Sequence, residues 1–323
     1  MSDELKDLAD SILAAGDPWK ELEAAGLTRL TLPEDAGGSG GTLVDLAVVL
    51  QAVGAAAADV PLVETDLAAW LLHTHGIAVP DGPLTAAAAA TDGAGPALAR
   101  VPWARGAAGV ALLAGRHVGL VLPGESTRTE GANLAEEPRD TLVVDTPLPA
   151  DRWVDARPGA EQEFRLRAAL GRSQLLAGAA RGALARTVQY AGERIQFGRP
   201  IGRFQAVQQQ LALAAAEVAA AGAAADAAAA TAEREGLSAA PTFVAVAAAK
   251  ARTGEAAGEV ARIAHQVHGA IGFTREHDLR RWTTRLWAWR DEDGSDADWQ
   301  TELGRRVLEE GPDALWPLVT GTP

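Results

Sequence analysis

Hydrophobic positions recur at helical spacing along the first 80 residues and are interrupted by turns. Apolar residues within 5–12 lie on one face of an amphipathic helix. The glycine-rich segment 32–41 then breaks the chain. After this break, the apolar residues of 43–53 again share one helical face, and Thr42 is a suitable N-cap for that helix. We therefore predict a helical N-terminal domain over residues 1–80.

The pattern changes in the middle of the chain. Short apolar runs alternate there with Gly, Pro and Asp, which is typical of strands joined by turns. The runs predict strands of a small β-domain over 81–157, which we expect to be antiparallel: 110–113, 118–122 and 141–144.

From residue 158 onward the helical pattern returns in much longer segments. The expected helices are 163–194, 204–235, 241–270, 276–290 and 296–310. Their alanine enrichment fits helices, because alanine has the highest helix propensity and allows close packing. The fold class that follows is α+β and mostly α, with a C-terminal helical bundle over 158–323.

Composition narrows the classes of partner and compartment. The chain has 323 residues and a formal net charge of −14, which disfavours nucleic acid and anionic lipid as partners. It contains no cysteine, so disulfides, thiolate nucleophiles and zinc–thiolate sites are excluded. We find no run near the roughly 18 apolar residues of a membrane span. These observations predict a soluble cytoplasmic protein with no membrane partner.

One candidate site is a helix end followed by a tight turn. Arg194 ends the helix, Gly198 and Pro200 turn the chain, and a glutamine-rich helix begins near Phe204. The planar guanidinium of Arg194 suits a phosphate or pyrophosphate. The same arginine could simply complement the helix dipole, and these residues alone favour that simpler interpretation.

A second candidate segment, 266–272, ends the long helix with small residues. Small side chains would let a polar ligand approach the backbone closely, although the segment could equally be an ordinary helix C-cap. His265 and His268 share a helix face, but the next acidic residue lies beyond a glycine turn. We therefore expect no metal site here.

The order of these motifs resembles that of the acyl-CoA dehydrogenases. Segment 32–41 (LPEDAGGSGG) is similar to the family's PE-x-x-GG segment. Segment 194–205 (RIQFGRPIGRFQ) resembles its R-x-QFG-x-PI-x-x-FQ signature. Segment 266–272 (QVHGAIG) resembles its Q-x-x-GG-x-G segment, with Ala270 in place of the second glycine.

The resemblance implies an N-terminal helical domain, a middle β-domain and a C-terminal four-helix bundle. It also implies FAD as the cofactor, held between subunits, with the first signature forming an arm that reaches the pyrophosphate of a partner's FAD. The residues that would contact FAD by this resemblance are Arg194, Gln196, Phe197, Phe204, Gln205, Gln266, His268 and Gly269.

The chain departs from the family where the catalytic base is expected. One of the two family positions for the base is Ala168, and the other is Asp293. Aspartate is one methylene shorter than the family's glutamate, and an ångström of misplacement can cost a base about a hundredfold in rate. Because four acidic residues lie within 291–296, we expect this segment to be a solvated turn. Asp293 is then a weak candidate for the base, and no other candidate is present at the two family positions.

The middle segment also lacks the family's Thr-Glu-Pro-Gly-type loop and Trp-Ile-Thr-type strand, which hold the flavin ring. We therefore expect a truncated β-domain and a chain similar to the short, degenerate subunit of actinobacterial α2β2 acyl-CoA dehydrogenases of the steroid side-chain type. The expected activity is α,β-dehydrogenation of an acyl-CoA together with a base-bearing second subunit.

The resemblance also implies electron-transferring flavoprotein as the electron acceptor. Two alternatives stay open at this point. The chain could be a complete homo-oligomeric dehydrogenase that uses Asp293 as its base, or a non-catalytic scaffold or acyl-CoA-binding partner.

Overall fold

A computed structural model describes residues 2–14, 16–89, 97–145, 148–311, 313 and 317. Its contacts divide the chain into two compact units. Unit 1 comprises Met1–Leu13, Ala47–Ala58 and Ala169–Pro323, and unit 2 comprises Ala14–Leu46 and Asp59–Ala168. The boundaries of these units differ from those of the three predicted domains, 1–80, 81–157 and 158–323, and the domain boundaries remain a prediction. Each unit is described by itself below.

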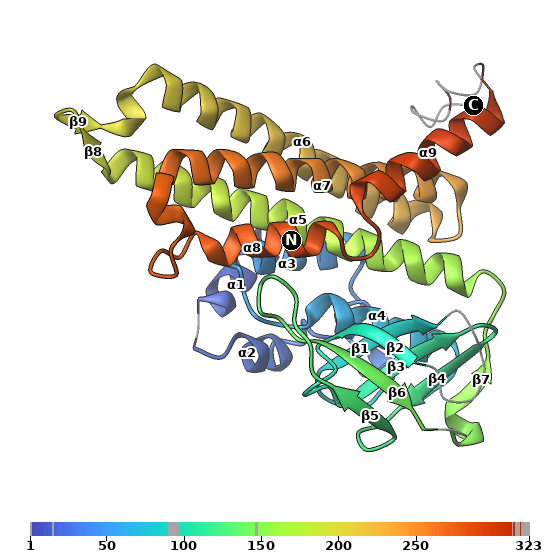
Figure 1. Ribbon diagram of the computed structural model, residues 1–323. Helices are drawn as coiled ribbons and strands as arrows, with labels where there is room; N and C mark the ends of the chain where they lie inside the picture. The colour runs from blue at the N-terminus through green and yellow to red at the C-terminus, as the bar shows by residue number, and fades with distance from the viewer. Residues whose placement is uncertain are drawn as a thin grey trace. The chain divides into compact units, whose positions relative to one another are not determined.

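Helices before and after a central group of strands account for most of the chain (Figure 1). The helices are α1 (Ser2–Leu13), α2 (Pro18–Ala24), η1 (Glu34–Ala36), α3 (Leu43–Ala56), α4 (Leu62–Thr74), η2 (Ala150–Arg152), α5 (Ala160–Glu193), η3 (Ile201–Arg203), α6 (Gln205–Glu235), α7 (Ala240–His268), η4 (Gly269–Phe273), α8 (Arg280–Arg290) and α9 (Asp296–Glu310). The strands are β1 (Leu84–Ala89), β2 (Ala97–Pro102), β3 (Gly109–Ala114), β4 (His117–Val121), β5 (Ser126–Thr129), β6 (Arg139–Val144), β7 (Trp153–Asp155), β8 (Ile195–Gln196) and β9 (Arg199–Pro200). The mostly helical fold class, with N-terminal helices, a middle β-region and C-terminal helices, is confirmed.

The predicted cap of α3 is confirmed in detail. The backbone N–H of Asp45 donates to the Thr42 hydroxyl oxygen at 3.0 Å, and the backbone N–H of Thr42 donates to the Asp45 carboxylate at 3.0 Å. This reciprocal pair satisfies two donors that the first turn of a helix leaves without partners. It explains why the helix begins directly after the glycine-rich turn.

Unit 2 contains two small sheets. One has the strand order β1-β3-β4-β7 and the other β2-β6-β5. The expected strands within 110–113, 118–122 and 141–144 are confirmed as parts of β3, β4 and β6. The expectation of a purely antiparallel unit is wrong for one pair, because β1 and β3 run parallel, with Leu84 opposite Gly109. The other pairs of strands in these two sheets are antiparallel.

Strand β3 is buried on both faces, which explains its uninterrupted apolar sequence. Ala111 and Leu113 belong to a core cluster shared with Leu71 and Leu72 of α4. The alternate side chains, including Leu112, belong to a second cluster with the strands of the other sheet. Successive side chains of a strand point to opposite faces, so one strand serves two cores.

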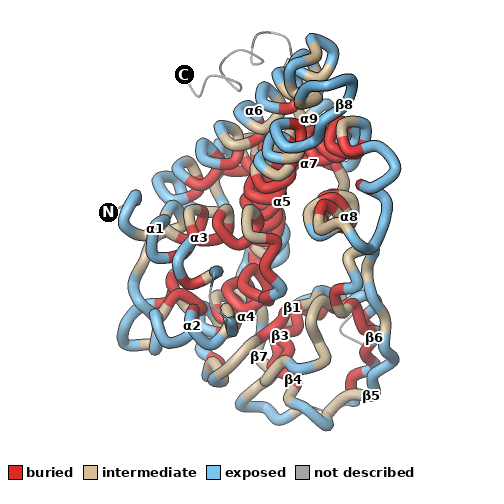
Figure 2. The backbone as a smooth tube through the Cα atoms, turned by 90° about the vertical axis from the view of Figure 1, so that its left-hand side faces the viewer, coloured by how far each residue is buried: buried red, intermediate tan, exposed pale blue. Residues whose placement is uncertain are grey.

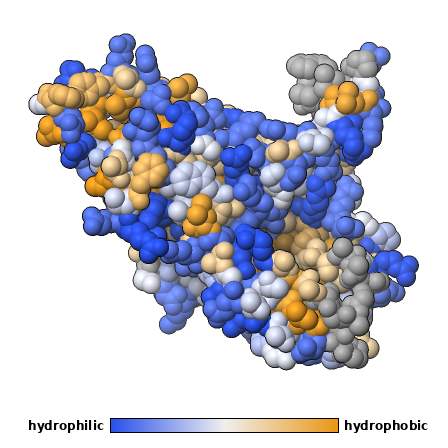
Figure 3. Space-filling model, viewed as in Figure 1, coloured by the Kyte–Doolittle hydropathy of each residue, from blue (hydrophilic) through white to orange (hydrophobic). Residues whose placement is uncertain are grey.

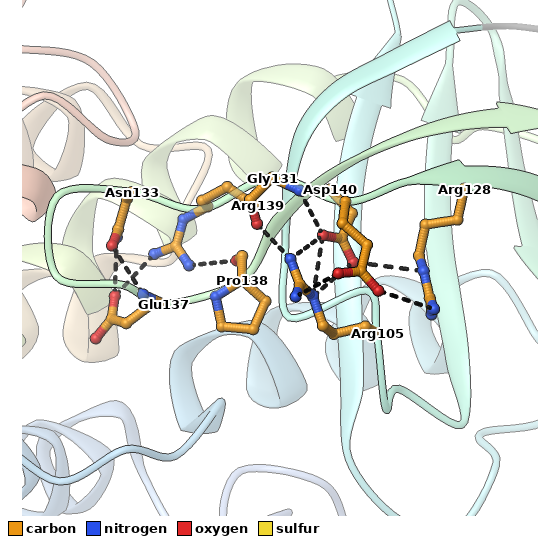
Figure 4. A network of polar contacts seen from close by, with 9 residues as sticks. Arg105, Arg128, Gly131, Asn133, Glu137, Pro138, Arg139 and Asp140 are labelled. Carbon is orange, nitrogen blue, oxygen red and sulfur yellow. Dashed lines mark hydrogen bonds and ion pairs between the residues drawn. The ribbon is translucent and has the colours of Figure 1, made fainter.

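A polar network ties β5 and β6 to the β2–β3 connection in unit 2 (Figure 4). The buried carboxylate of Asp140 accepts hydrogen bonds from Arg105, at 2.7 Å from one guanidinium nitrogen, and from the backbone N–H of Gly131 at 3.1 Å. Burial alone would raise the pKa of Asp140, but the bond from Arg105 and the charge of Arg128 hold that pKa below its usual value. The network is therefore a charged structural element of the β-region.

Helix α5 is the central helix of unit 1. Figure 2 shows buried positions along much of its length, and every residue from 169 to 180 is buried. Two glycines allow α3 to approach it closely. A Cβ on Gly178 would lie 2.1 Å from the Gln51 carbonyl oxygen, and one on Gly54 would lie 2.3 Å from the Leu175 carbonyl oxygen. Only glycine permits this backbone separation.

Helix α6 lies along α7 in unit 1 (Figure 1). Among the described residues, α6 is the only helix that is long and apolar enough on average to cross a membrane, although it contains no uninterrupted apolar run of 18 residues. Its apolar character comes mainly from alanine, and small residues such as Ala221 and Ala225 are buried. The same composition serves a helix packed within a bundle, so it is weak evidence for a membrane span.

Candidate functional site

The segment around Arg194 forms a short hairpin, here called the arm (residues 194–204). It follows α5, and its strands β8 and β9 pair through Ile195 with Pro200 and through Gln196 with Arg199. The two turn residues between the strands, Phe197 and Gly198, have φ angles of 52° and 81°. Positive φ at both central residues is the pattern of a two-residue type I′ hairpin turn.

One backbone hydrogen bond connects the arm to the last turn of α5, and another closes the arm itself. The N–H of Arg194 donates to the Tyr190 carbonyl oxygen at 2.9 Å, and the N–H of Ile201 donates to the Arg194 carbonyl oxygen at 2.8 Å. The side chains of Arg194 and Gln196 are exposed. The guanidinium of Arg194 is thus placed where it can meet a phosphate of another molecule.

The arm also exposes apolar surface. Phe197 is 91% exposed and Ile195 62% exposed. Phe204, half-buried just before α6, receives the edge of the Phe197 ring at 6.1 Å between centroids and the guanidinium of Arg199 at 4.4 Å. In Figure 3 hydrophobic residues gather at the end of the molecule that carries β8 and β9. Exposed apolar surface of this kind is typical of regions that contact another molecule.

The second predicted segment borders a cavity of about 530 Å³ at the end of α7. Gln266 is exposed on the last turn, and Gly269 ends the helix with φ of 64°. The arrangement thus brings the predicted Gln266 and Gly269 together around one cavity. Its lining residues are Gly258, Arg262, His265, Gln266, Gly269, Ala270, Phe273 and Trp287.

An aromatic stack forms one wall of this cavity and was not predicted. The His265 ring lies between Phe273, at 4.2 Å between centroids, and Trp287, at 5.1 Å. Its Nε2 is 3.1 Å from the Thr283 hydroxyl oxygen. Burial lowers the pKa of His265, which favours the uncharged ring. The position of Trp287 in the sequence, 15 residues after segment 266–272, does not predict this stack. The stack forms because α8 packs back against α7.

His268, a predicted FAD contact, lies in the interior of unit 1 rather than in the cavity wall. It is 4% exposed, and its ring stacks on Tyr190 with 4.3 Å between centroids. Nδ1–H donates to the Ala264 carbonyl oxygen at 2.7 Å. Burial lowers the pKa of His268 to about 4. Within the described ranges no group of histidine, aspartate and glutamate side chains could hold a metal ion.

Asp293 is engaged in an ion pair. Its carboxylate accepts a hydrogen bond from Nε of Arg172 at 2.9 Å, and Glu292 lies 3.4 Å from the same guanidinium, whose side chain is only 3% exposed. Trp299 donates its indole N–H to the Asp293 carbonyl oxygen at 3.0 Å, and Asp296 is buried. The expectation of a solvated turn at 291–296 is therefore wrong, because the turn is anchored to α5 and α9.

A buried lysine, also missed from sequence, holds the same turn from the other side. Nζ of Lys250 donates to the carbonyl oxygens of Arg290 and Gly294 at 2.8 and 2.6 Å. Burial lowers the pKa of Lys250 to about 8, although the charge of Asp293 opposes this shift. The sequence around Lys250 predicts only a helix, and it does not show that the carbonyl oxygens of Arg290 and Gly294 will lie next to this side chain.

The order of helices and β-structure and the two motif segments together define the class of protein. Residues 1–78 match the family model "Acyl-CoA dehydrogenase, N-terminal domain", and residues 167–308 match "Acyl-CoA dehydrogenase, C-terminal domain". The chain belongs to the acyl-CoA dehydrogenase family, oxidoreductases that act on the CH–CH group of acyl-CoA and are FAD flavoproteins.

Among particular relatives, the chain is similar to acyl-CoA dehydrogenase IpdE2 of Mycolicibacterium smegmatis. The two are 32% identical over 275 residues, which cover 83% of this chain and 80% of that protein. IpdE2 of Mycobacterium tuberculosis is also 32% identical, over 83% of this chain and 79% of its own length.

Two solved structures with similar folds come from heteromeric complexes. One is a variant of the Tcur3481–Tcur3483 steroid acyl-CoA dehydrogenase, with a TM-score of 0.82 and 27% identity over 96% of this chain and 98% of that chain. The other is the ChsE4–ChsE5 complex from Mycobacterium tuberculosis, with a TM-score of 0.83 and 25% identity over the same shares.

Proposed function

We propose that this chain is the subunit without a catalytic base in a heteromeric, FAD-dependent acyl-CoA dehydrogenase. The observation that carries the proposal is the state of the two base positions. Residue 168 is an alanine, and the carboxylate of Asp293 is hydrogen-bonded to the buried guanidinium of Arg172. A carboxylate in such a pair is not free to approach and remove a proton from a bound thioester. The base then comes from the second subunit.

The residues present fit the adenosine and pyrophosphate parts of FAD. The cavity of about 530 Å³ offers aromatic surface together with the side chains of Arg262 and Gln266. Arg194 and Gln196 project from the arm and supply a fixed cation and a neutral amide for a pyrophosphate. Bound FAD supplies the hydride acceptor, and this chain's residues bind and orient its dinucleotide part.

The remaining predicted contacts act through the arm and the helix ends. Phe197 supplies exposed apolar surface to the partner, while Phe204 and Gln205 form the base of the arm at the start of α6. Gly269 lets the ligand approach the backbone. His268 supports the site from inside unit 1.

The relatives support the partner and the class of substrate. The ChsE4–ChsE5 and Tcur3481–Tcur3483 structures are complexes of unlike chains, and the latter is described as a steroid acyl-CoA dehydrogenase. By this similarity we assign an α2β2 assembly, a steroid side-chain CoA ester as substrate and electron-transferring flavoprotein as acceptor. The site of action is cytoplasmic in this proposal.

Expression of this chain alone and together with a candidate base-bearing subunit tests the proposal. We expect FAD-dependent dehydrogenation, followed with an artificial electron acceptor and steroid side-chain CoA esters, only from the co-expressed pair. Full flavin content and activity from this chain by itself would overturn it.

The alternative of a complete enzyme with Asp293 as base has a separate test. Asp293→Asn in the co-expressed complex should leave turnover within about twofold of the wild type, because the side chain pairs with Arg172 rather than with substrate. A loss of about a thousandfold or more would restore Asp293 as the base.

A further inference from the structure

We propose that Tyr190 and His268 form a positioning pair that holds the arm and the cavity in register, so that one dinucleotide can be contacted by both. The inference rests on the proposed function, because it assigns a role to two residues in FAD binding. Tyr190 is the only tyrosine of the chain and lies in the last turn of α5. His268 is the last residue of α7.

The ends of α5 and α7 are in direct contact through these two rings. The rings of Tyr190 and His268 stack with 4.3 Å between centroids and an interplanar angle of 20°. The ring of His277, in the connection between η4 and α8, meets both edge-on, at 5.7 Å from Tyr190 and 4.8 Å from His268. One aromatic cluster thus joins the end of α5 to the end of α7 and to the connection that follows it.

A short stretch of backbone connects each of the two residues to a predicted ligand-binding group. The Tyr190 carbonyl oxygen accepts the N–H of Arg194, the first residue of the arm. His268 directly precedes Gly269, which borders the cavity, and a Cβ on Gly272 would lie 2.9 Å from the Cβ of His268. A shift of the backbone at either residue would therefore be passed on to the arm or to the turn that borders the cavity.

Within the described residues, the hairpin tip of the arm has few contacts of its own. Phe197 at the tip is 91% exposed, and the described ring contacts of the arm join only Phe197, Arg199 and Phe204 to one another. The orientation of the arm is therefore set where it joins α5 and α6, and Tyr190 lies at the α5 end. A rigid base matters because groups that bind one ligand from two segments gain affinity only when their geometry is fixed in advance.

The second ring nitrogen of His268, Nε2, adds no hydrogen bond to the pair. This nitrogen is buried and has no hydrogen-bond partner among the residues that the structure describes. An unpaired buried nitrogen is costly, whereas a phenylalanine ring could fill the same space without that cost. We infer that the planar ring and its stack on Tyr190 are the required property, which predicts that phenylalanine can replace His268.

The test uses the complex of this chain with its base-bearing subunit, stripped of flavin and titrated with FAD. Tyr190→Ala and His268→Ala should each raise the Kd for FAD about fivefold to tenfold, the range expected when a ring stack is lost. The matched variants Tyr190→Phe and His268→Phe keep both rings and should stay within about twofold of the wild type. Adenosine, which needs only the cavity, is titrated in competition and should keep its affinity in the Tyr190→Ala complex.

The outcomes are distinguishable. Unchanged FAD affinity in both alanine variants, or an equal loss for FAD and adenosine in Tyr190→Ala, overturns the positioning pair. A wild-type complex that binds no FAD overturns the proposed function and this inference with it. Circular dichroism and gel filtration verify folding and assembly, and Tyr190→Leu takes the place of Tyr190→Ala if the alanine variant does not assemble.

Discussion

The buried ionisable side chains of unit 1 are accommodated in different ways, as Arg172, Lys250 and His268 illustrate. Arg172 faces the carboxylates of Glu292 and Asp293. Lys250 donates to two carbonyl oxygens, and burial lowers its pKa to about 8. His268 stays neutral at pH 7, because burial lowers its pKa to about 4. The energetic cost of burial is thus offset by ion pairing, by hydrogen bonding or by loss of charge.

Removal of the Arg172 charge should destabilise unit 1. Arg172→Met leaves two carboxylates without their buried partner, and we expect a loss of about 2–4 kcal/mol in the free energy of unfolding. Urea denaturation measures this loss. Arg165→Met, at an exposed position of the same helix, is the control and should cost less than about 1 kcal/mol. Equal effects of the two substitutions would contradict the role given to Arg172.

The pKa of His268 predicts a dependence of stability on pH. Because burial lowers this pKa from 6.5 to about 4, the unfolded chain binds more protons than the folded chain between these values. The free energy of unfolding therefore decreases as pH falls through this window. His268→Phe should lose about 2 kcal/mol less than the wild type between pH 7 and pH 5 in urea denaturation. Identical slopes for both proteins would show that His268 does not titrate as described.

Among the elements, glycine sets how closely the helices of unit 1 approach. Gly54 and Gly178 lie at the crossing of α3 and α5, where the backbones nearly touch. Gly222 lies on α6, where a Cβ would meet no atom within 4 Å. Glycine is therefore required at the crossing, whereas at Gly222 it only lowers helix propensity.

Alanine substitutions should separate these two kinds of glycine. Gly178→Ala places a Cβ against the Gln51 carbonyl oxygen and should destabilise the chain by about 2–3 kcal/mol. Gly222→Ala should stabilise it by about 0.5–1 kcal/mol through helix propensity. Thermal unfolding gives both values, and a Gly178→Ala variant as stable as the wild type would rule out the close crossing.

For the whole molecule, charge and exposed surface are distributed unevenly. The chain has a net charge of −14, whereas the arm carries Arg194, Arg199 and Arg203 beside exposed Phe197. A basic and apolar projection on an acidic chain suits a partner site that holds an anion. The proposed heteromeric enzyme places FAD there.

Substitutions in the arm should act on assembly and cofactor binding rather than on folding. Arg194→Gln should leave the melting temperature of the isolated chain unchanged and lower the FAD content of the complex, with Kd raised about tenfold or more. Arg203→Gln, at an exposed residue of the arm outside the predicted contact set, is the control. Unchanged flavin content in the Arg194 variant would contradict the proposed contact.

Much of the fold could be predicted from the sequence because local rules determine it. The cap at Thr42, the apolar run of β3 and the long alanine-rich helices each follow from short-range patterns. The parallel pairing of β1 with β3 could not be predicted, because it joins strands that are separated along the chain by β2. Pairing partners depend on long-range packing rather than on local composition.

The candidate site divides in the same way. The sequence by itself determined the motifs, since Arg194 and Gln266 lie in recognisable segments, and it determined the alanine at position 168. Only the tertiary structure decided that Asp293 meets Arg172 and that His268 stacks on Tyr190 rather than bordering the cavity. The physical reason is that a motif defines which groups are available, whereas burial and neighbours from other helices define the charge, orientation and access of each group.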